Sequence, residues 1–133
     1  MKKITCKIND NLTVELRNVV ETYGHDDSIP FNADIYVFLD GKKRATYAGY
    51  AYNDGWGGMS TIHCDNEKVQ PILKQLNKDL RQNRKVPYEQ GGKIIDYLDA
   101  DFEFLVNLMV EECLYCNVKD FDFEKNFVPK KTA

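Results

Sequence analysis

The sequence predicts an α+β fold, in which an antiparallel sheet of about five strands carries two main helices packed on one face. Apolar and polar residues alternate over most of the first half, as in half-buried strands. The period then becomes helical in two stretches, Val69 to Asn83 and Asp101 to Cys116. A length of 133 residues fits one domain, so we expect residues 1–133 to share a single core.

The first predicted element is a hairpin with one solvent-exposed face. Ile4, Cys6 and Ile8 alternate with polar residues. The same alternation returns in Leu12, Val14 and Leu16 after the turn formed by residues 9–11. The stretch from Glu21 to Ala33 has no period and several helix and strand breakers, so it is predicted to be a loop.

The stretch from Asp34 to Cys64 is predicted to form the centre of the sheet. It consists of the strands Asp34 to Leu39, Arg44 to Tyr52 and Met59 to Cys64. The Asp40-Gly41 turn favours a hairpin, because both residues tolerate positive φ. We expect the helices to cover the aliphatic face of this region. The opposite face is then expected to show Tyr36, Phe38 and some of Tyr47, Tyr50 and Tyr52.

The helical half is predicted from Val69 onward. Pro71 suits a first helical turn, whereas Pro87 and Gly91-Gly92 mark a predicted loop. Phe102 to Cys116 is apolar almost all round and is expected to be the most buried element. Phe121, Phe123 and Phe127 are expected to pack back as an arm or short strand. The predicted core includes Ile35, Val37, Leu39, Leu73, Leu76, Leu80, Leu105, Leu108 and Met109.

No apolar run reaches the ~18 residues that span a bilayer, and Met1-Lys2-Lys3 does not lead into a signal-peptide core. We therefore expect a cytoplasmic protein that contacts no membrane. The four cysteines, Cys6, Cys64, Cys113 and Cys116, lie in apolar stretches at irregular spacing. This pattern favours reduced thiols over a secreted disulfide framework.

The net charge of −3 argues against direct binding of nucleic acid, which needs a basic footprint. The charge is unevenly distributed. Residues 67–85 have a net charge of +4, and residues 89–124 a net charge of −8. We expect Asp96, Asp99, Asp101 and Glu103 to gather at the start of the second helix, where the helix dipole favours anions.

Two candidate metal sites compete with structural explanations. His63 and Cys64 with Cys113 and Cys116 could supply four zinc ligands, because Cys113 and Cys116 have the spacing of a metal or redox pair. That pair ends an apolar helix, and adjacent strand residues point to opposite faces, so buried free thiols are favoured. The acids at the second helix could bind a divalent cation, but their spacing fits no EF-hand loop. No cofactor is expected.

The loop Asp54-Gly55-Trp56-Gly57-Gly58 has two interpretations. Amides freed by glycine could cradle the phosphate of a nucleotide signal. However, phosphate-binding glycine motifs precede a helix, whereas a strand is predicted here. The alternative is a turn with a packed or partner-facing Trp56. Separately, His25-Asp26-Asp27 could hold a general base, although no nucleophile motif accompanies it.

The Asn53-Asp54-Gly55-Trp56-Gly57-Gly58 loop follows a hairpin whose turn contains Gly41-Lys42-Lys43. In these two features the sequence resembles small uncharacterised proteins of bacteriophages and other mobile elements. The resemblance covers about thirty residues. It implies a setting, because small acidic proteins in such genomes are often inhibitors of host immune systems, including anti-CRISPR proteins.

We therefore expect a non-enzymatic protein that binds a host protein stoichiometrically, such as a nucleic-acid-binding defence protein with basic grooves. A small metal-dependent or thiol enzyme and a nucleotide-signal-binding protein remain the alternatives. The predicted contact residues are Trp56 and Asp54 in the loop, and the acidic residues Asp96, Asp99, Asp101, Glu111, Glu112, Asp120 and Asp122.

Overall fold

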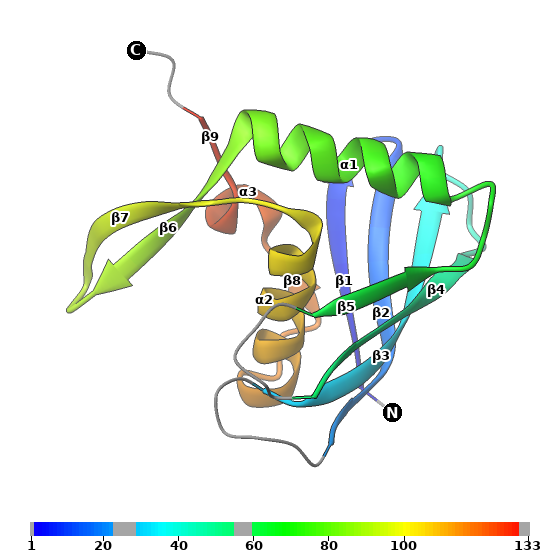
Figure 1. Ribbon diagram of the computed structural model, residues 1–133, viewed down its shortest axis with the longest axis horizontal. Helices are drawn as coiled ribbons and strands as arrows, with labels where there is room; N and C mark the ends of the chain where they lie inside the picture. The colour runs from blue at the N-terminus through cyan, green and yellow to red at the C-terminus, as the bar shows by residue number, and fades with distance from the viewer. Residues whose placement is uncertain (1, 23–28, 55–59, 131–133) are drawn as a thin grey trace.

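The computed structural model describes residues 2–22, 29–54 and 60–130 (Figure 1). Its main sheet has six strands in the order β5-β4-β3-β2-β1-β8, and a second sheet has three in the order β7-β6-β9. The strands of the main sheet are β1 (Lys2–Asn9), β2 (Leu12–Glu21), β3 (Phe31–Leu39), β4 (Thr46–Asn53), β5 (Thr61–Cys64) and β8 (Asp120–Phe121). The second sheet contains β6 (Arg84–Gln90), β7 (Lys93–Asp99) and β9 (Val128–Pro129). The helices are α1 (Gln70–Asn83), α2 (Phe102–Tyr115) and α3 (Phe123–Asn126).

The predicted α+β class is confirmed, and so are both main helices to within one residue at each end. Strand boundaries differ more. Strand β3 begins at Phe31 rather than at Asp34, so the predicted loop between Glu21 and Ala33 is shorter. Strands β4 and β5 begin two residues later than predicted, at Thr46 and Thr61. No helix in the described ranges is long and apolar enough to cross a membrane.

The core lies between the aliphatic face of the main sheet and the helices. Helix α2 packs on β1 and β2, and α1 runs across one end of the strands (Figure 1). Ile35 and Val37 are fully buried, as their alternation with aromatic residues predicted. Leu39 and Leu108, also predicted as core, are only partly buried and pack against its margin. The predicted core is confirmed for Ile35, Val37, Leu73, Leu76, Leu80, Leu105 and Met109.

The prediction of a loop around Pro87 and Gly91-Gly92 is wrong. Strands β6 and β7 form a hairpin there, and its two-residue turn has φ values of 58° at Gly91 and 80° at Gly92. A tight primed turn needs positive φ at both positions, which glycine adopts without steric cost. Asp96 and Asp99 therefore lie on β7, not at the start of α2 as predicted. We call residues 84–99 the hairpin arm, because Figure 1 shows it projecting from the body of the protein.

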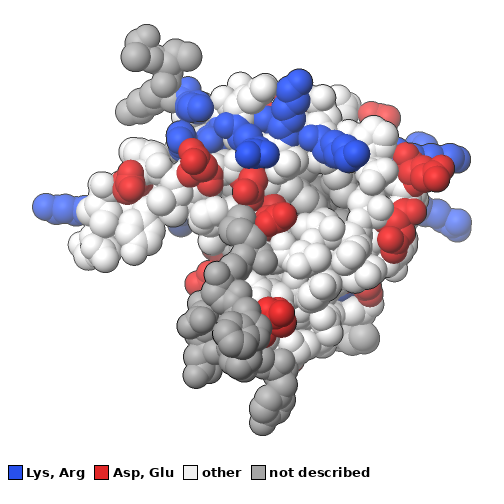
Figure 2. Space-filling model, in the orientation of Figure 1, with Lys and Arg blue, Asp and Glu red and all other residues white. Residues whose placement is uncertain are grey.

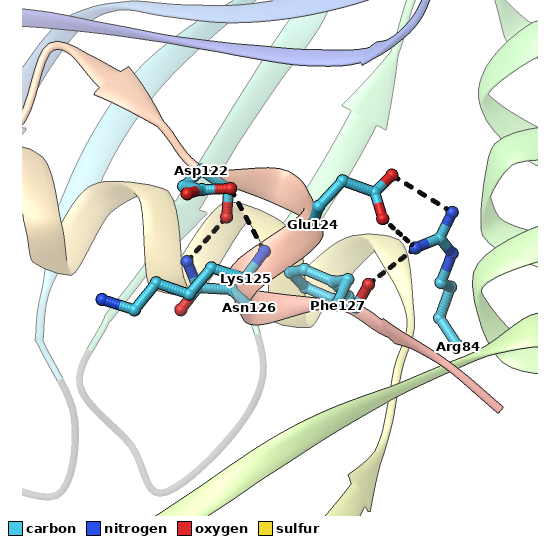
Figure 3. A network of polar contacts seen from close by, with 6 residues as sticks. All are labelled: Arg84, Asp122, Glu124, Lys125, Asn126 and Phe127. Atoms are coloured by element: carbon cyan, nitrogen blue, oxygen red, sulfur yellow. Dashed lines mark hydrogen bonds and ion pairs between the residues drawn. The ribbon is translucent and has the colours of Figure 1, made fainter. Parts of the chain in front are cut away.

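The C-terminal segment links the two sheets. Strand β8 pairs in parallel with β1, and β9 pairs with β6. The segment does pack back, as predicted, and it buries Phe121, Phe123 and Phe127. Arg84 fixes it in place (Figure 3): Nη1 donates hydrogen bonds of 2.8 Å to Glu124 Oε2 and to the carbonyl oxygen of Phe127.

Candidate binding surface

The structure separates the acidic residues that were predicted to form one surface. Asp96 and Asp99 lie on the hairpin arm, whereas Asp101 caps the N-terminus of α2 and accepts a 2.7 Å hydrogen bond from the amide of Phe104. Glu111 comes ten residues after Asp101, about 15 Å further along a helix that rises 1.5 Å per residue. In Figure 2 the acids are scattered on the visible face, while Lys and Arg gather along α1.

Two of these acids have shifted pKa values with identifiable causes. The hydrogen bond and positive charge of Lys85, whose Nζ lies 2.5 Å from Asp99 Oδ1, hold the pKa of Asp99 below its usual range. Burial raises the pKa of Glu112, and nearby Glu111 and Asp122 add to this against the opposing charge of Lys125. Glu111, Glu112 and Asp122 thus come together near the C-terminal end of α2, with Asp120 exposed on the adjacent β8.

The loop predictions fall mostly outside the described residues. Trp56 lies there, as do His25, Asp26 and Asp27. Asp54 follows directly after β4 and is exposed. Binding through the tryptophan loop, whether of a partner protein or of a nucleotide, therefore stays a prediction.

The candidate zinc ligands are not brought together within the described ranges. The ring of His63 stacks on Tyr50, whereas its neighbour Cys64 packs against the core, as expected for adjacent residues of one strand. Cys113 is buried and Cys116 exposed, and both are free thiols. Burial raises the pKa of Cys6 to about 12 and also raises the pKa of Cys113, which disfavours the reactive thiolate at both positions.

Aromatic side chains cover the part of the main sheet that faces away from the core. Tyr47, Tyr50 and Tyr52 are 37–40% exposed. The ring centroids of Tyr50 and His63 lie 4.7 Å apart, and those of Tyr52 and His63 lie 6.0 Å apart, with both pairs stacked. Tyr36 meets Tyr47 edge to face at 5.4 Å. This confirms the predicted aromatic side of the sheet. We call Tyr36, Tyr47, Tyr50, Tyr52 and His63 the aromatic face.

Strand pairing explains why these rings meet. Tyr50 on β4 pairs directly with His63 on β5, and Tyr36 on β3 pairs with Tyr47 on β4. Gly49 makes the β4–β5 approach possible, because a Cβ at this position would lie only 1.8 Å from the carbonyl oxygen of His63. Sequence reasoning considered His63 as a metal ligand or a catalytic group and missed its place beside the tyrosines.

Polar contacts fix the edge of the aromatic face on β2. The guanidinium of Arg17 lies 4.1 Å from the ring centroid of Tyr36 and also donates to Glu15. Glu15 is buried and accepts a second hydrogen bond, of 2.9 Å, from Thr5 Oγ1. Burial and the nearby Asp34 carboxylate raise the pKa of Tyr47, whose neutral hydroxyl can donate a hydrogen bond. The surface is therefore both ordered and able to donate hydrogen bonds.

Comparisons of the chain with protein-family models, with curated proteins and with solved structures gave no match.

Proposed function

We propose that this protein acts by stoichiometric binding of a partner protein, with the aromatic face as its principal contact. The supporting observation is the exposed ladder of Tyr50, His63 and Tyr52, whose rings are stacked on one another. Tyrosine is enriched in the residues that dominate binding energy at protein interfaces, because its ring buries a large apolar area and its hydroxyl can form a hydrogen bond.

The stacking favours binding for a further reason. A side chain that is already held in one orientation loses little conformational entropy when a partner covers it. Tyr50 and His63 lie within 26° of parallel, and Tyr52 and His63 within 12°. The aromatic face is therefore organised before any partner arrives, as in binding sites built on rigid tyrosines.

The charge around this face favours a protein over a nucleic acid as its partner. Nucleic-acid affinity depends on cations that neutralise phosphates. Arg17, which lies over Tyr36, is paired with Glu15, and Asp34 adds a negative charge on the same side of the sheet. These carboxylates offset the positive charge that a phosphate backbone would need.

The setting of this binding is proposed from the resemblance to proteins of mobile elements. An inhibitor that binds a host defence protein in the cytoplasm would fit both the small size and the acidic character of the chain. The acids Glu112, Asp120 and Asp122 would provide a second contact to the basic groove of a nucleic-acid-binding defence protein. The predicted contacts through Asp54 and Trp56 belong to this same proposal.

The test compares wild type with a Tyr50→Ala, Tyr52→Ala double variant. A partner captured from bacterial lysate is first purified, and its stoichiometry and affinity are then measured by calorimetry. Loss of both tyrosine side chains should weaken binding at least about thirtyfold, equivalent to about 2 kcal/mol. Lys78→Ala is the control, because Lys78 is exposed on α1, outside the aromatic face and the acidic residues at the end of α2. Equal affinity of wild type and the double variant, with both folded, would contradict the proposal.

A further inference from the structure

The hairpin arm exposes large apolar side chains along its length. Ile94 is 48% and Ile95 54% exposed, and Tyr88 and Tyr97 are exposed to a similar degree. A two-stranded hairpin is at best marginally stable in water without packing against something else. Clustered apolar exposure on a soluble domain commonly marks an interaction site. These features indicate that the arm contacts a partner.

A β-bulge in β7 determines how the arm can contact that partner. The β6–β7 register pairs Tyr88 with Asp96 and Glu89 with Ile94, so that Ile95 is the extra residue. A bulge interrupts the strand edge and makes strand addition along it less favourable. It also presents an additional side chain near the turn. The arm is thus suited to inserting side chains rather than to extending a sheet.

A groove of about 490 Å³ lies where the arm meets the body. Its walls come from the base of the arm, from α2 and from the start of β3, and they are mainly apolar. They include Phe31, Val86, Leu98, Phe104, Leu108 and Val110. Glu111 on α2 lies at the groove and is exposed. The groove therefore offers an apolar site with an acidic residue beside it.

The arm and the groove match one another in chemistry. Ile94 and Ile95 supply apolar side chains, and the adjacent Lys93 supplies a cation opposite in sign to Glu111. Neither Lys93 nor Glu111 makes an ion pair with another described residue. The tip of the arm and the groove lie on the same chain. A two-fold symmetric contact requires such a pair of complementary surfaces on each copy.

We propose that a second copy of this chain occupies the groove. The arms of two copies lie side by side in opposite directions, and each inserts Ile94 and Ile95 into the groove at the base of the other arm. Leu98 is the fourth residue after Ile94, about 13 Å further along the strand, so that the turn of one arm reaches the base of its partner. Lys93 of each copy then meets Glu111 of the other. The aromatic faces remain uncovered in this dimer.

The first test is the oligomeric state of the full chain, measured by sedimentation equilibrium over a hundredfold range of concentration. Wild type should be a dimer, and an Ile94→Asp, Ile95→Asp variant should be monomeric with its helices and sheet intact by circular dichroism. Val20→Asp is the control and should remain dimeric, because Val20 is 46% exposed but lies on β2 of the main sheet. A monomeric wild type, or a dimer that survives the double substitution, would overturn the proposal.

A charge exchange tests the register of the contact without disturbing the fold. Lys93→Glu and Glu111→Lys, each alone, should raise the dimer dissociation constant by up to about thirtyfold, because two-fold symmetry places each substitution in two exposed ion pairs. The two substitutions together in one chain should restore the wild-type value. Additive losses in the double variant would show that Lys93 does not meet Glu111. A monomeric wild type whose affinity for a captured protein falls on Ile94→Asp, Ile95→Asp would instead assign the arm to that other protein.

Discussion

The main sheet and the hairpin arm place isoleucines in opposite environments. Ile35 on β3 is fully buried beneath the helices, whereas Ile94 and Ile95 on β7 are about half exposed. Both regions contain antiparallel strand pairs. The difference is that helices cover one face of the main sheet, while the arm projects from the body of the protein (Figure 1). Apolar residues of the same type thus stabilise the fold in one region and remain available for association in the other.

The largest expected effect comes from shortening an isoleucine in each region. Ile35→Ala should destabilise the protein by about 2–5 kcal/mol, because it leaves a cavity in the core. Ile95→Ala should change the unfolding free energy by less than about 0.5 kcal/mol, because its side chain is largely solvated. Urea unfolding at concentrations where monomers dominate would measure both. Similar losses in the two variants would show that the arm is buried to the same degree as the sheet.

Replacing one glycine by alanine in each region compares how tightly the main sheet and the hairpin arm are packed. Gly49→Ala should cost roughly 2–3 kcal/mol, because the new Cβ would collide with the backbone of His63 and force β4 and β5 apart. Gly92→Ala should cost only about 1 kcal/mol, since it has positive φ but no atom within 4 Å of the added carbon.

Unfolding measurements would rank the two glycine variants, and NMR would follow the rings of Tyr50 and His63. Their resonances should move in Gly49→Ala and stay in place in Gly92→Ala. If the Gly49→Ala protein keeps both its stability and its ring stacking, the close approach of β4 and β5 is not required.

The smallest expected effect is a pH dependence in the arm. Because the folded-state pKa of Asp99 is lowered by Lys85, the pair stabilises the protein above the unfolded-state pKa of Asp99. This contribution is lost as the pH falls below about 4. Asp99→Asn should therefore lower the melting temperature slightly at pH 7, and the difference from wild type should vanish once the pH is low enough to protonate Asp99 in the folded state.

Asp96→Asn provides the control for this titration. Asp96 lies on the same strand, and its carboxylate accepts a hydrogen bond from the amide of Tyr97 rather than pairing with a lysine of the described chain. A pH-dependent difference of equal size in both variants would mean that general charge on β7, not the Lys85 contact, causes the effect.

Sequence reasoning succeeded where the signal is local. The alternation of Ile35 and Val37 with aromatic residues identified both faces of the central strands, because side chains of a strand alternate with a period of two. It failed at residues 84–99, where the acids also fit a helix start and concealed the hairpin. The Gly91-Gly92 turn, followed by β-favouring Ile94, Ile95 and Tyr97, was the signal that could have revealed it.

The candidate binding surface was less predictable, because it depends on pairing between strands. The tyrosines were expected on one face, but the stack with His63 requires the β4–β5 register that Gly49 permits. The separation of Asp96 and Asp99 from Glu111 and Glu112 likewise depends on where the arm projects. Neither relation leaves a pattern within a short window of sequence.

The parallel pairing of β1 with β8 has a consequence for synthesis on the ribosome. Thr5 pairs with Asp120 and Cys6 with Phe121, so one side of β1 stays unpaired until the chain has grown past residue 121. Strands β1 to β4 are sequential neighbours and can pair as they emerge. Contacts between such distant residues form late and slow folding. Until then the open side of β1 is exposed to pairing with a neighbouring chain and to aggregation.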